Sequence, residues 1–251
     1  MARVAALWRH PIKSHGREAL QSVALAAGQP FPWDRRWAVV HDAAVDDAST
    51  GWIPCQNFMI GTRTPGLAGI WARFDEAKGE IALRHADLGE ISFSPDDAED
   101  QARFLDWVMP LCPETRARPA AVVALPGRGW TDTDYPSVTL MNSASHAAVE
   151  ERLGRSLEPE RWRGNIWFDG QDAFEELDWI GKRLRAGTAI LEVREPVKRC
   201  LHTAANPQTG TRDADTLGAL DAGWGHRNFG IYTEVVQDGA VALGDELEIL
   251  N

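Results

Sequence analysis

The pattern of apolar and polar positions predicts a chain built mainly of short strands. Short apolar or alternating stretches end close to glycines, as expected for strands that are separated by turns. We expect strands over residues 4–8, 37–41, 81–85, 91–93, 138–141, 166–168, 189–193, 231–236, 241–243 and 247–249. Asp238 and Gly239 stand between two of these stretches and predict a hairpin.

Apolar residues at helical spacing predict fewer helices. One is expected after Ser94, which can cap it, and before Pro110. A second begins at Ser143 or Ser145 and ends at Gly154. A short third helix is expected over residues 173–179.

The order of these elements predicts an α+β, β-rich protein, with a barrel or folded sheet and inserted helices. No Gly-rich phosphate loop joins a strand to a helix, which argues against a doubly wound parallel sheet. Residues 116–135 show little periodicity and read as a crossing segment. We therefore expect an N-terminal domain over residues 1–117 and a C-terminal domain over residues 118–251.

Composition narrows the classes of protein. The chain has 251 residues, of which 44% are hydrophobic, enough for a sizeable core. Its three cysteines are widely spaced without a CxxC pair, which argues against a disulfide framework or a four-cysteine zinc site. No signal peptide and no run of about 18 apolar residues is present. We expect a cytoplasmic protein without a membrane anchor.

Charge is distributed unevenly along the chain. The net charge of −11 argues against binding to nucleic acid. Residues 1–37 nevertheless carry six basic and two acidic residues, whereas residues 75–114 carry eleven acidic and three basic ones. The first segment suits an anionic ligand, and the second is either a solvated face or a docking surface.

Cys200 is the most informative single residue. It follows Lys198 and Arg199, and neighbouring positive charges favour the thiolate, which is a ligand for soft metals. Free cysteines are also among the most buried residues, so an inert core thiol explains Cys200 equally well.

Basic residues elsewhere suggest an anion site, and each has a plainer explanation. Lys13 and Ser14 follow a proline and could contact phosphate oxygens together, or Lys13 could simply be solvated. Arg35 offers a planar fork for an anion or an ion pair with Asp34. Arg163 adds another guanidinium.

Two asparagines are similarly ambiguous. The Asn165 amide could bind the urea-like edge of a pterin or make hydrogen bonds at the start of a strand. Asn142, just before the second predicted helix, is either a cap or a ligand contact.

Seven short segments carry a family resemblance in their order along the chain. They are RHPIKS at residues 9–14, WDRRW at 33–37, SVTLMNSAS at 137–145, RWRGNI at 161–166, KRC to TG over 198–210, GIY at 230–232 and GD at 244–245. Together they resemble the MOSC family with its N-terminal MOSC β-barrel domain, whose members include the mitochondrial amidoxime-reducing component and YcbX-type proteins.

The resemblance implies a molybdenum cofactor (Mo-molybdopterin). Cys200 would be the protein ligand of the metal, and an acidic residue near the metal would be Asp132 or Asp134, which are also candidate proton donors. The residues that match the family's cofactor-contacting positions are Lys13, Ser14, Arg35, Asn142, Ser145, Arg163, Asn165 and Lys198.

This chain departs from the family pattern in three places. Glycine replaces the usual proline at Gly164, and residues 38–61 differ from the amidoxime-reducing pattern. YcbX-type proteins usually carry a C-terminal ferredoxin domain, whereas this chain ends at Asn251. We therefore expect electrons from a separate flavin reductase or ferredoxin-like protein.

Three functional hypotheses remain. The first is a molybdenum oxidoreductase that reduces N-hydroxylated compounds such as hydroxylaminopurines, amidoximes and hydroxylamines. The second is a sulfur-carrying or cofactor-binding protein that uses a Cys200 persulfide. The third is a structural or regulatory barrel with an inert cysteine.

Overall fold

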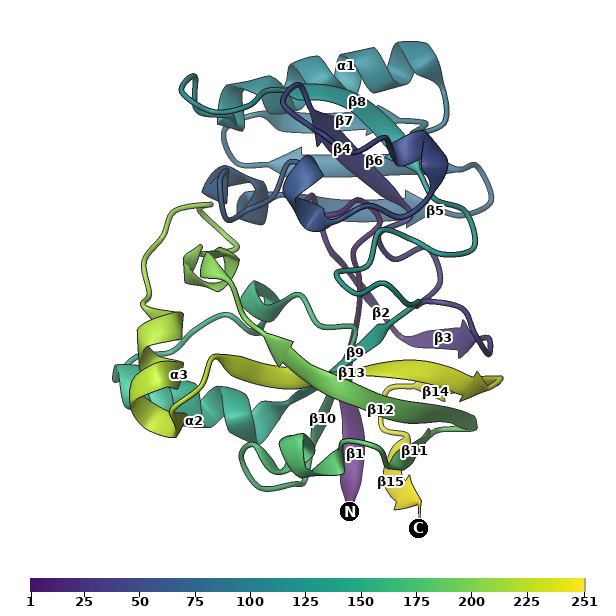
Figure 1. The fold of residues 1–251 in the computed structure, drawn as a ribbon, viewed down its shortest axis with the longest axis vertical. Coiled ribbons are helices and arrows are strands. Elements are labelled where there is room, and N and C mark those ends of the chain that lie inside the picture. Colours follow the sequence, from purple (N-terminus) through teal and green to yellow (C-terminus); the bar gives the residue numbers. More distant parts are fainter. Residues whose placement is uncertain (251) are drawn as a thin grey trace.

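Seven strands close a barrel that forms the lower part of the molecule in Figure 1. The computed structural model describes residues 1–250. Neighbouring strands follow the order β10, β9, β13, β12, β11, β15, β1, and β1 pairs with β10 to close the ring. Their bounds are β1 Ala2–Arg9, β9 Val138–Asn142, β10 Ile166–Asp169, β11 Arg183–Ala186, β12 Ala189–Lys198, β13 Asn228–Gln237 and β15 Glu246–Leu250.

Alternating side chains fill this barrel. Strand β1 alternates buried and more exposed residues, as a strand with one face on a core does. Leu140, Leu184, Leu191 and Ile231 from four different strands are completely buried in one apolar cluster. The chain therefore needs both its first and its last strands to complete this core.

A second layered unit lies above the barrel (Figure 1). It contains a three-stranded antiparallel sheet of β5 (Trp71–Asp75), β6 (Glu80–His85) and β7 (Gly89–Phe93), and a pair formed by β4 (Trp37–His41) and β8 (Pro119–Ala124). Helix α1 (Ala98–Val108) packs on it through Phe104, whose ring stacks on Phe93 at 4.6 Å between centroids.

Helices α2 (Ser143–Leu153) and α3 (Thr216–Trp224) lie beside the barrel. Asn142 caps α2 by accepting a hydrogen bond from the Ala144 N–H, and Gly154 ends it in the left-handed conformation. Short 3₁₀ turns follow: Pro159–Trp162 precedes β10, and Leu201–Ala204 follows Cys200. These two turns bring functional candidates to the upper rim of the barrel.

The chain crosses between the two units more than once. After β1, strand β2 (Glu18–Leu20) extends the barrel sheet, and β3 (Ser22–Leu25) pairs with β14 (Gly239–Ala242). The chain then enters the upper unit, and β8 pairs with β4 there before the chain returns. The domain division after residue 117 stays a prediction, since strands on both sides of it belong to each unit.

The α+β, β-rich class is confirmed, and a strand lies at each of the ten predicted places. The predicted hairpin is wrong, because β14 pairs with β3 instead of β13. A Cβ on Gly239 would lie 2.2 Å from the Ala189 nitrogen, so a glycine is needed here for a close backbone contact. Helix α1 begins later than expected, since Asp97, not Ser94, caps it.

Among residues 1–250, none of the helices combines the length and the apolar character that crossing a bilayer requires.

Candidate functional site

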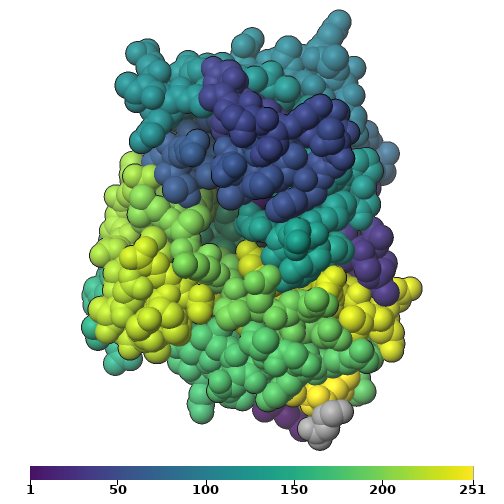
Figure 2. Space-filling model, in the orientation of Figure 1, coloured from purple at the N-terminus to yellow at the C-terminus, as the bar shows by residue number. Residues whose placement is uncertain are grey.

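A cavity of about 400 Å³ opens between the two units. Figure 2 shows the molecule hollowed between the blue N-terminal unit and the green strands and turns below it. Its volume is in the range of small-molecule and cofactor pockets. Its charged lining consists of Lys13, Arg35, Arg161, Arg163, Lys198 and Arg199, together with Asp132 and Glu195.

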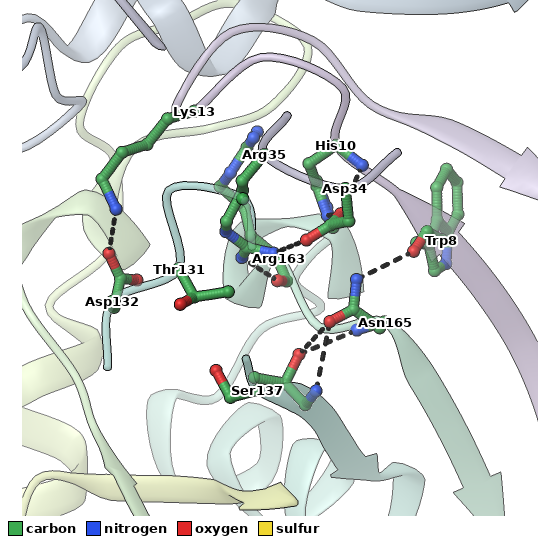
Figure 3. A network of polar contacts seen from close by, with 12 residues as sticks. Trp8, His10, Lys13, Asp34, Arg35, Thr131, Asp132, Ser137, Arg163 and Asn165 are labelled. Carbon is green, nitrogen blue, oxygen red and sulfur yellow. Dashed lines mark hydrogen bonds and ion pairs between the residues drawn. The ribbon is translucent and has the colours of Figure 1, made fainter. Parts of the chain in front are cut away.

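Lys13 and Ser14 reach this cavity from a tight turn after β1. The Lys13 N–H bonds to the Trp37 carbonyl at 2.8 Å, which ties the turn to strand β4. The Lys13 ammonium is buried and donates to the Trp130 carbonyl at 2.9 Å and to the Asp132 carboxylate (Figure 3). Lys13 therefore enters the site already paired with an acid.

Arg35 belongs to a buried polar trio with Asp34 and His10 (Figure 3). Asp34 accepts from the His10 N–H at 2.7 Å and pairs with the Arg35 guanidinium. Burial by itself raises the pKa of Asp34, but Arg35 and His10 outweigh burial and hold that pKa well below its ordinary value. Arg35 also donates to the Arg163 carbonyl at 3.1 Å, so the trio fixes two arginines together.

The positively charged guanidinium of Arg163 is only partly hydrogen-bonded to the protein. Its guanidinium donates to the Gly16 carbonyl at 3.1 Å, but a second nitrogen, Nη2, is buried without a hydrogen-bond partner in the described part of the chain. Burial and the neighbouring charge of Arg35 lower the pKa of Arg163 to about 9. An anionic ligand would relieve both the unpaired nitrogen and the charge repulsion.

Asn165 does not line the cavity and is fully engaged in the protein. Its side-chain oxygen accepts from the Thr139 N–H at 3.1 Å and hydroxyl at 2.9 Å, and its amide donates to the Trp8 carbonyl (Figure 3). These bonds tie β9, β10 and β1 together two residues after Arg163. The structure therefore supports the second interpretation of Asn165, in which its amide makes hydrogen bonds at the start of a strand.

Three residues of the cavity have left-handed backbones. The φ angles are 63° at Ser14, 50° at Arg35 and 50° at Arg163. Residues other than glycine rarely adopt this region, and such conformations cluster at ligand and active sites. All three had been predicted to contact a cofactor.

Cys200 lies at the edge of the same cavity. Its thiol is exposed, and the Thr62 hydroxyl donates to its sulfur at 3.2 Å. Arg199 turns inward and donates to the carbonyls of Trp162 and Phe229 at 2.7 and 2.8 Å. The inert core thiol that chemistry alone allowed is therefore excluded, because Cys200 is accessible.

The two candidate aspartates differ in position. Both are exposed, but Asp132 lines the cavity and Asp134 does not. Partial desolvation at the cavity wall tends to raise the pKa of Asp132, but the positive charges of Lys13 and Arg35 outweigh it and lower the pKa to about 2. Asp132 is thus a carboxylate at neutral pH and has no proton to donate there.

Asn142 and Ser145 lie elsewhere. Both are completely buried and donate to the Glu176 carboxylate, at 2.9 Å from each side chain. Ser145 also accepts from the Phe174 N–H at 2.7 Å. The structure does not bring these two residues to the cavity, because they hold the turn at Glu175–Trp179 against helix α2.

Replacing Ser145 by alanine should therefore affect stability and not cofactor content. The change leaves the Phe174 N–H without a partner and removes one donor from the buried Glu176 carboxylate, which keeps the bond from Asn142. We therefore expect a loss of about 1–3 kcal/mol in the free energy of unfolding. Ser143→Ala, two residues earlier, is the control and should change the free energy of unfolding by less than about 0.5 kcal/mol. Urea denaturation measures both; a Ser145→Ala variant that unfolds normally but lacks cofactor would contradict this assignment.

Sequence reasoning gave no role to several cavity residues. Cys55, Gly61, His202 and Tyr232 line it, and His202 stands two residues after Cys200. The neighbourhood of Cys200 was the one signal that could have drawn attention to His202. Cys55 and Gly61 come from the segment after β4, which no motif marked.

Buried histidines near Arg163 predict a pH dependence of stability. Burial, with a further contribution from Arg163, lowers the pKa of His10 to about 3 and that of His15 to about 4. Because these folded-state values lie below the unfolded value near 6.5, the unfolded chain binds protons first as the pH falls. The free energy of unfolding should fall by about 1.4 kcal/mol per pH unit for each histidine between pH 6.5 and about 4. Denaturation at several pH values should show that the free energy of unfolding depends less steeply on pH in His15→Gln, by the equivalent of one proton. An unchanged slope in His15→Gln would contradict this prediction.

Comparison with known proteins agrees with the motifs. Residues 1–110 match the MOSC N-terminal beta barrel domain, and residues 132–248 match the MOSC domain. A Drosophila grimshawi protein named molybdenum cofactor sulfurase is 33% identical over 47% of this chain and 17% of its own length. The human mitochondrial amidoxime reducing component 2 is 31% identical over 45% of this chain and 36% of its own length.

The matched segments thus span well under half of either relative. Among solved structures, the YUAD protein from Bacillus subtilis aligns over 99% of this chain and 94% of its own, with 15% identity and a TM-score of 0.48. The two domain matches follow one another and cover most of the sequence. The chain therefore belongs to the MOSC family and carries the MOSC N-terminal β-barrel domain ahead of its MOSC domain.

Proposed function

We propose that this protein is a molybdenum cofactor-dependent oxidoreductase that reduces N-hydroxylated compounds with electrons from a separate redox protein. The observation that carries the proposal is the cavity itself. It combines an accessible thiol at Cys200 with surplus positive charge, including the unpaired nitrogen of Arg163. Kinship with an amidoxime reducing component supports the substrate class.

The cavity fits the chemistry of a pyranopterin cofactor. Six cationic and two acidic residues line it in a protein whose net charge is −11. In the described residues no carboxylate lies within 4 Å of Arg163, Arg199 or Lys198, whereas Lys13, Arg35 and Arg161 are paired. Burial lowers the pKa of Arg199 to about 10, so a nearby anion would stabilise its charged form. A phosphate-bearing ligand would supply that charge.

Each residue then has a definite task. Cys200 would supply the thiolate ligand, while Arg35 and Arg163 would hold anionic and polar groups of the pterin from neighbouring left-handed positions. Lys13 and Asp132 would fix a charge pair beside them. The bound cofactor supplies two-electron redox chemistry that no amino-acid side chain offers.

The electron donor is proposed from charge. The acidic segment 75–114 includes β6, β7 and α1, and exposed carboxylates such as Glu80, Glu90 and Asp106 lie along it. A flavin reductase or ferredoxin-like protein with a basic surface could dock there. The electron-transfer rate should fall as ionic strength rises; a rate independent of salt would contradict electrostatic docking.

Reduction of an N-hydroxylated base tests the function directly. Protein loaded with molybdenum cofactor, given a chemical reductant and 6-hydroxylaminopurine or benzamidoxime, should produce the corresponding amine or amidine. Loaded protein that reduces neither compound would overturn the activity and leave cofactor binding standing.

A sulfur-carrying role is the second candidate. It is favoured by the accessible Cys200 thiol and by relatives named molybdenum cofactor sulfurase. Mass spectrometry of protein without molybdenum should then find a persulfide on Cys200. If no persulfide is found on Cys200 and the protein binds molybdenum, the result favours the oxidoreductase.

A further inference from the structure

His202 places an imidazole beside Cys200 without an assigned role. The 3₁₀ turn Leu201–Ala204 begins directly after Cys200, and the His202 ring lines the cavity from that turn. Within residues 1–250 neither ring nitrogen makes a hydrogen bond to the protein. A polar ring that faces a cavity and has no protein partner is available to a ligand.

Gly61 shapes the slot that holds this ring. A Cβ at position 61 would lie 1.7 Å from His202 Nδ1 and 2.3 Å from Cε1. The φ angle of Gly61 is not in the left-handed region, so close approach of the ring, and not backbone conformation, explains the glycine. The adjacent residue, Thr62, donates to the Cys200 sulfur at 3.2 Å. One short segment of the N-terminal unit therefore places both the imidazole and the thiol.

Two polar side chains near Cys200 are already engaged. Asp132 pairs with Lys13, and the Thr62 hydroxyl is directed to Cys200. The imidazole can donate from one nitrogen and accept at the other. An N-hydroxyl group also both donates and accepts, so the two are complementary.

We propose that His202 is a substrate-binding residue that hydrogen-bonds to the N-hydroxyl group of a substrate held beside Cys200. The proposal rests on the proposed function and names a residue that determines its specificity. It also explains why the segment opposite Cys200 carries a glycine at position 61.

Binding without turnover provides the first test. Benzamidoxime is titrated calorimetrically into cofactor-loaded protein in the absence of reductant, with benzamidine as the probe that lacks the hydroxyl group. We expect His202→Leu to bind benzamidoxime about tenfold more weakly than wild type. His202→Asn, which keeps a donor and an acceptor, should recover part of that affinity, and benzamidine should bind all three proteins equally.

Displacement of the ring provides the second test. Gly61→Ala should lower the melting temperature and weaken benzamidoxime binding, because the new methyl group takes the place of the ring. In the double variant Gly61→Ala with His202→Ala, the melting temperature should recover while binding stays weak. Gly223→Ala, in helix α3 and next to only the flexible side chain of Arg152, is the matched control and should do neither.

The outcomes separate this inference from the proposed function. Equal benzamidoxime affinity in wild type and His202→Leu, or a wild type that does not bind benzamidoxime, overturns the role of His202. Pterin content, measured in each variant, should stay at the wild-type level; its loss in His202→Leu would overturn a role confined to substrate. A wild type that binds benzamidoxime through His202 but never reduces it overturns the proposed function instead.

Discussion

Replacing Arg163 by glutamine should stabilise the cofactor-free protein and weaken its hold on the cofactor. Arg163 keeps one guanidinium nitrogen buried without a partner and stands beside the positive charge of Arg35. A neutral side chain removes that repulsion, so we expect the free energy of unfolding to rise by about 1 kcal/mol, net of the lost bond to Gly16. Loss of a charge-assisted hydrogen bond, about 1.5–3 kcal/mol, should weaken pterin binding roughly 10- to 100-fold.

Arg161 is the matched control for this prediction. It lines the same cavity but is paired with both Glu158 and Asp213. Arg161→Gln leaves two carboxylates without their partner and should lower the free energy of unfolding by about 1–3 kcal/mol. Denaturation of cofactor-free protein and fluorescence of released pterin measure the two effects. Destabilisation by Arg163→Gln, with normal pterin content, would show that Arg163 has only a structural role.

Replacing Cys200 by alanine should abolish the proposed reductase activity and leave the fold intact. The thiol is exposed and accepts one hydrogen bond, from Thr62, so the free energy of unfolding should change by less than about 0.5 kcal/mol. The proposed activity would depend on the Cys200 thiolate as the protein ligand of the metal. We expect turnover of benzamidoxime to fall to the level of protein without molybdenum.

Cys55 provides the control thiol. It is exposed and lines the same cavity, from the turn Cys55–Asn57. Partial desolvation raises the pKa of the Cys55 thiol, with a further contribution from Asp132, so Cys55 is less suited to metal ligation. Cys55→Ala should keep most of the activity. If it abolishes turnover and Cys200→Ala does not, the ligand has been assigned to the wrong cysteine.

Local sequence signals predicted ten strands correctly but missed β2, β3, β5, β8 and β11, and they failed where tertiary contacts decide. Asp238 and Gly239 have hairpin chemistry, but Gly239 serves a close contact with Ala189 instead. Helix α3 escaped prediction because Gly218 and Gly223 interrupt its sequence and lower its helix propensity, whereas Asp215 caps it in the structure.

The candidate site shows the same division. Lys13, Arg35, Arg163 and Cys200 belong to separate motifs, and the structure brings them around one cavity. Asn142 and Ser145 sit within a family motif, yet their side chains are directed to the buried Glu176, which the sequence does not reveal. No sequence pattern marks Gly61, because the need for a glycine there arises from its contact with the His202 ring, which comes from a distant part of the chain.

The central claim is that this cavity holds a molybdenum cofactor through Cys200. The most direct test is the molybdenum and pterin content of protein purified from a host that makes the cofactor, with wild type and Cys200→Ala analysed side by side. We predict close to one molybdenum and one pterin per wild-type chain, and a loss of most of the molybdenum in Cys200→Ala. Wild-type protein with neither molybdenum nor pterin above the level of Cys200→Ala would contradict the account.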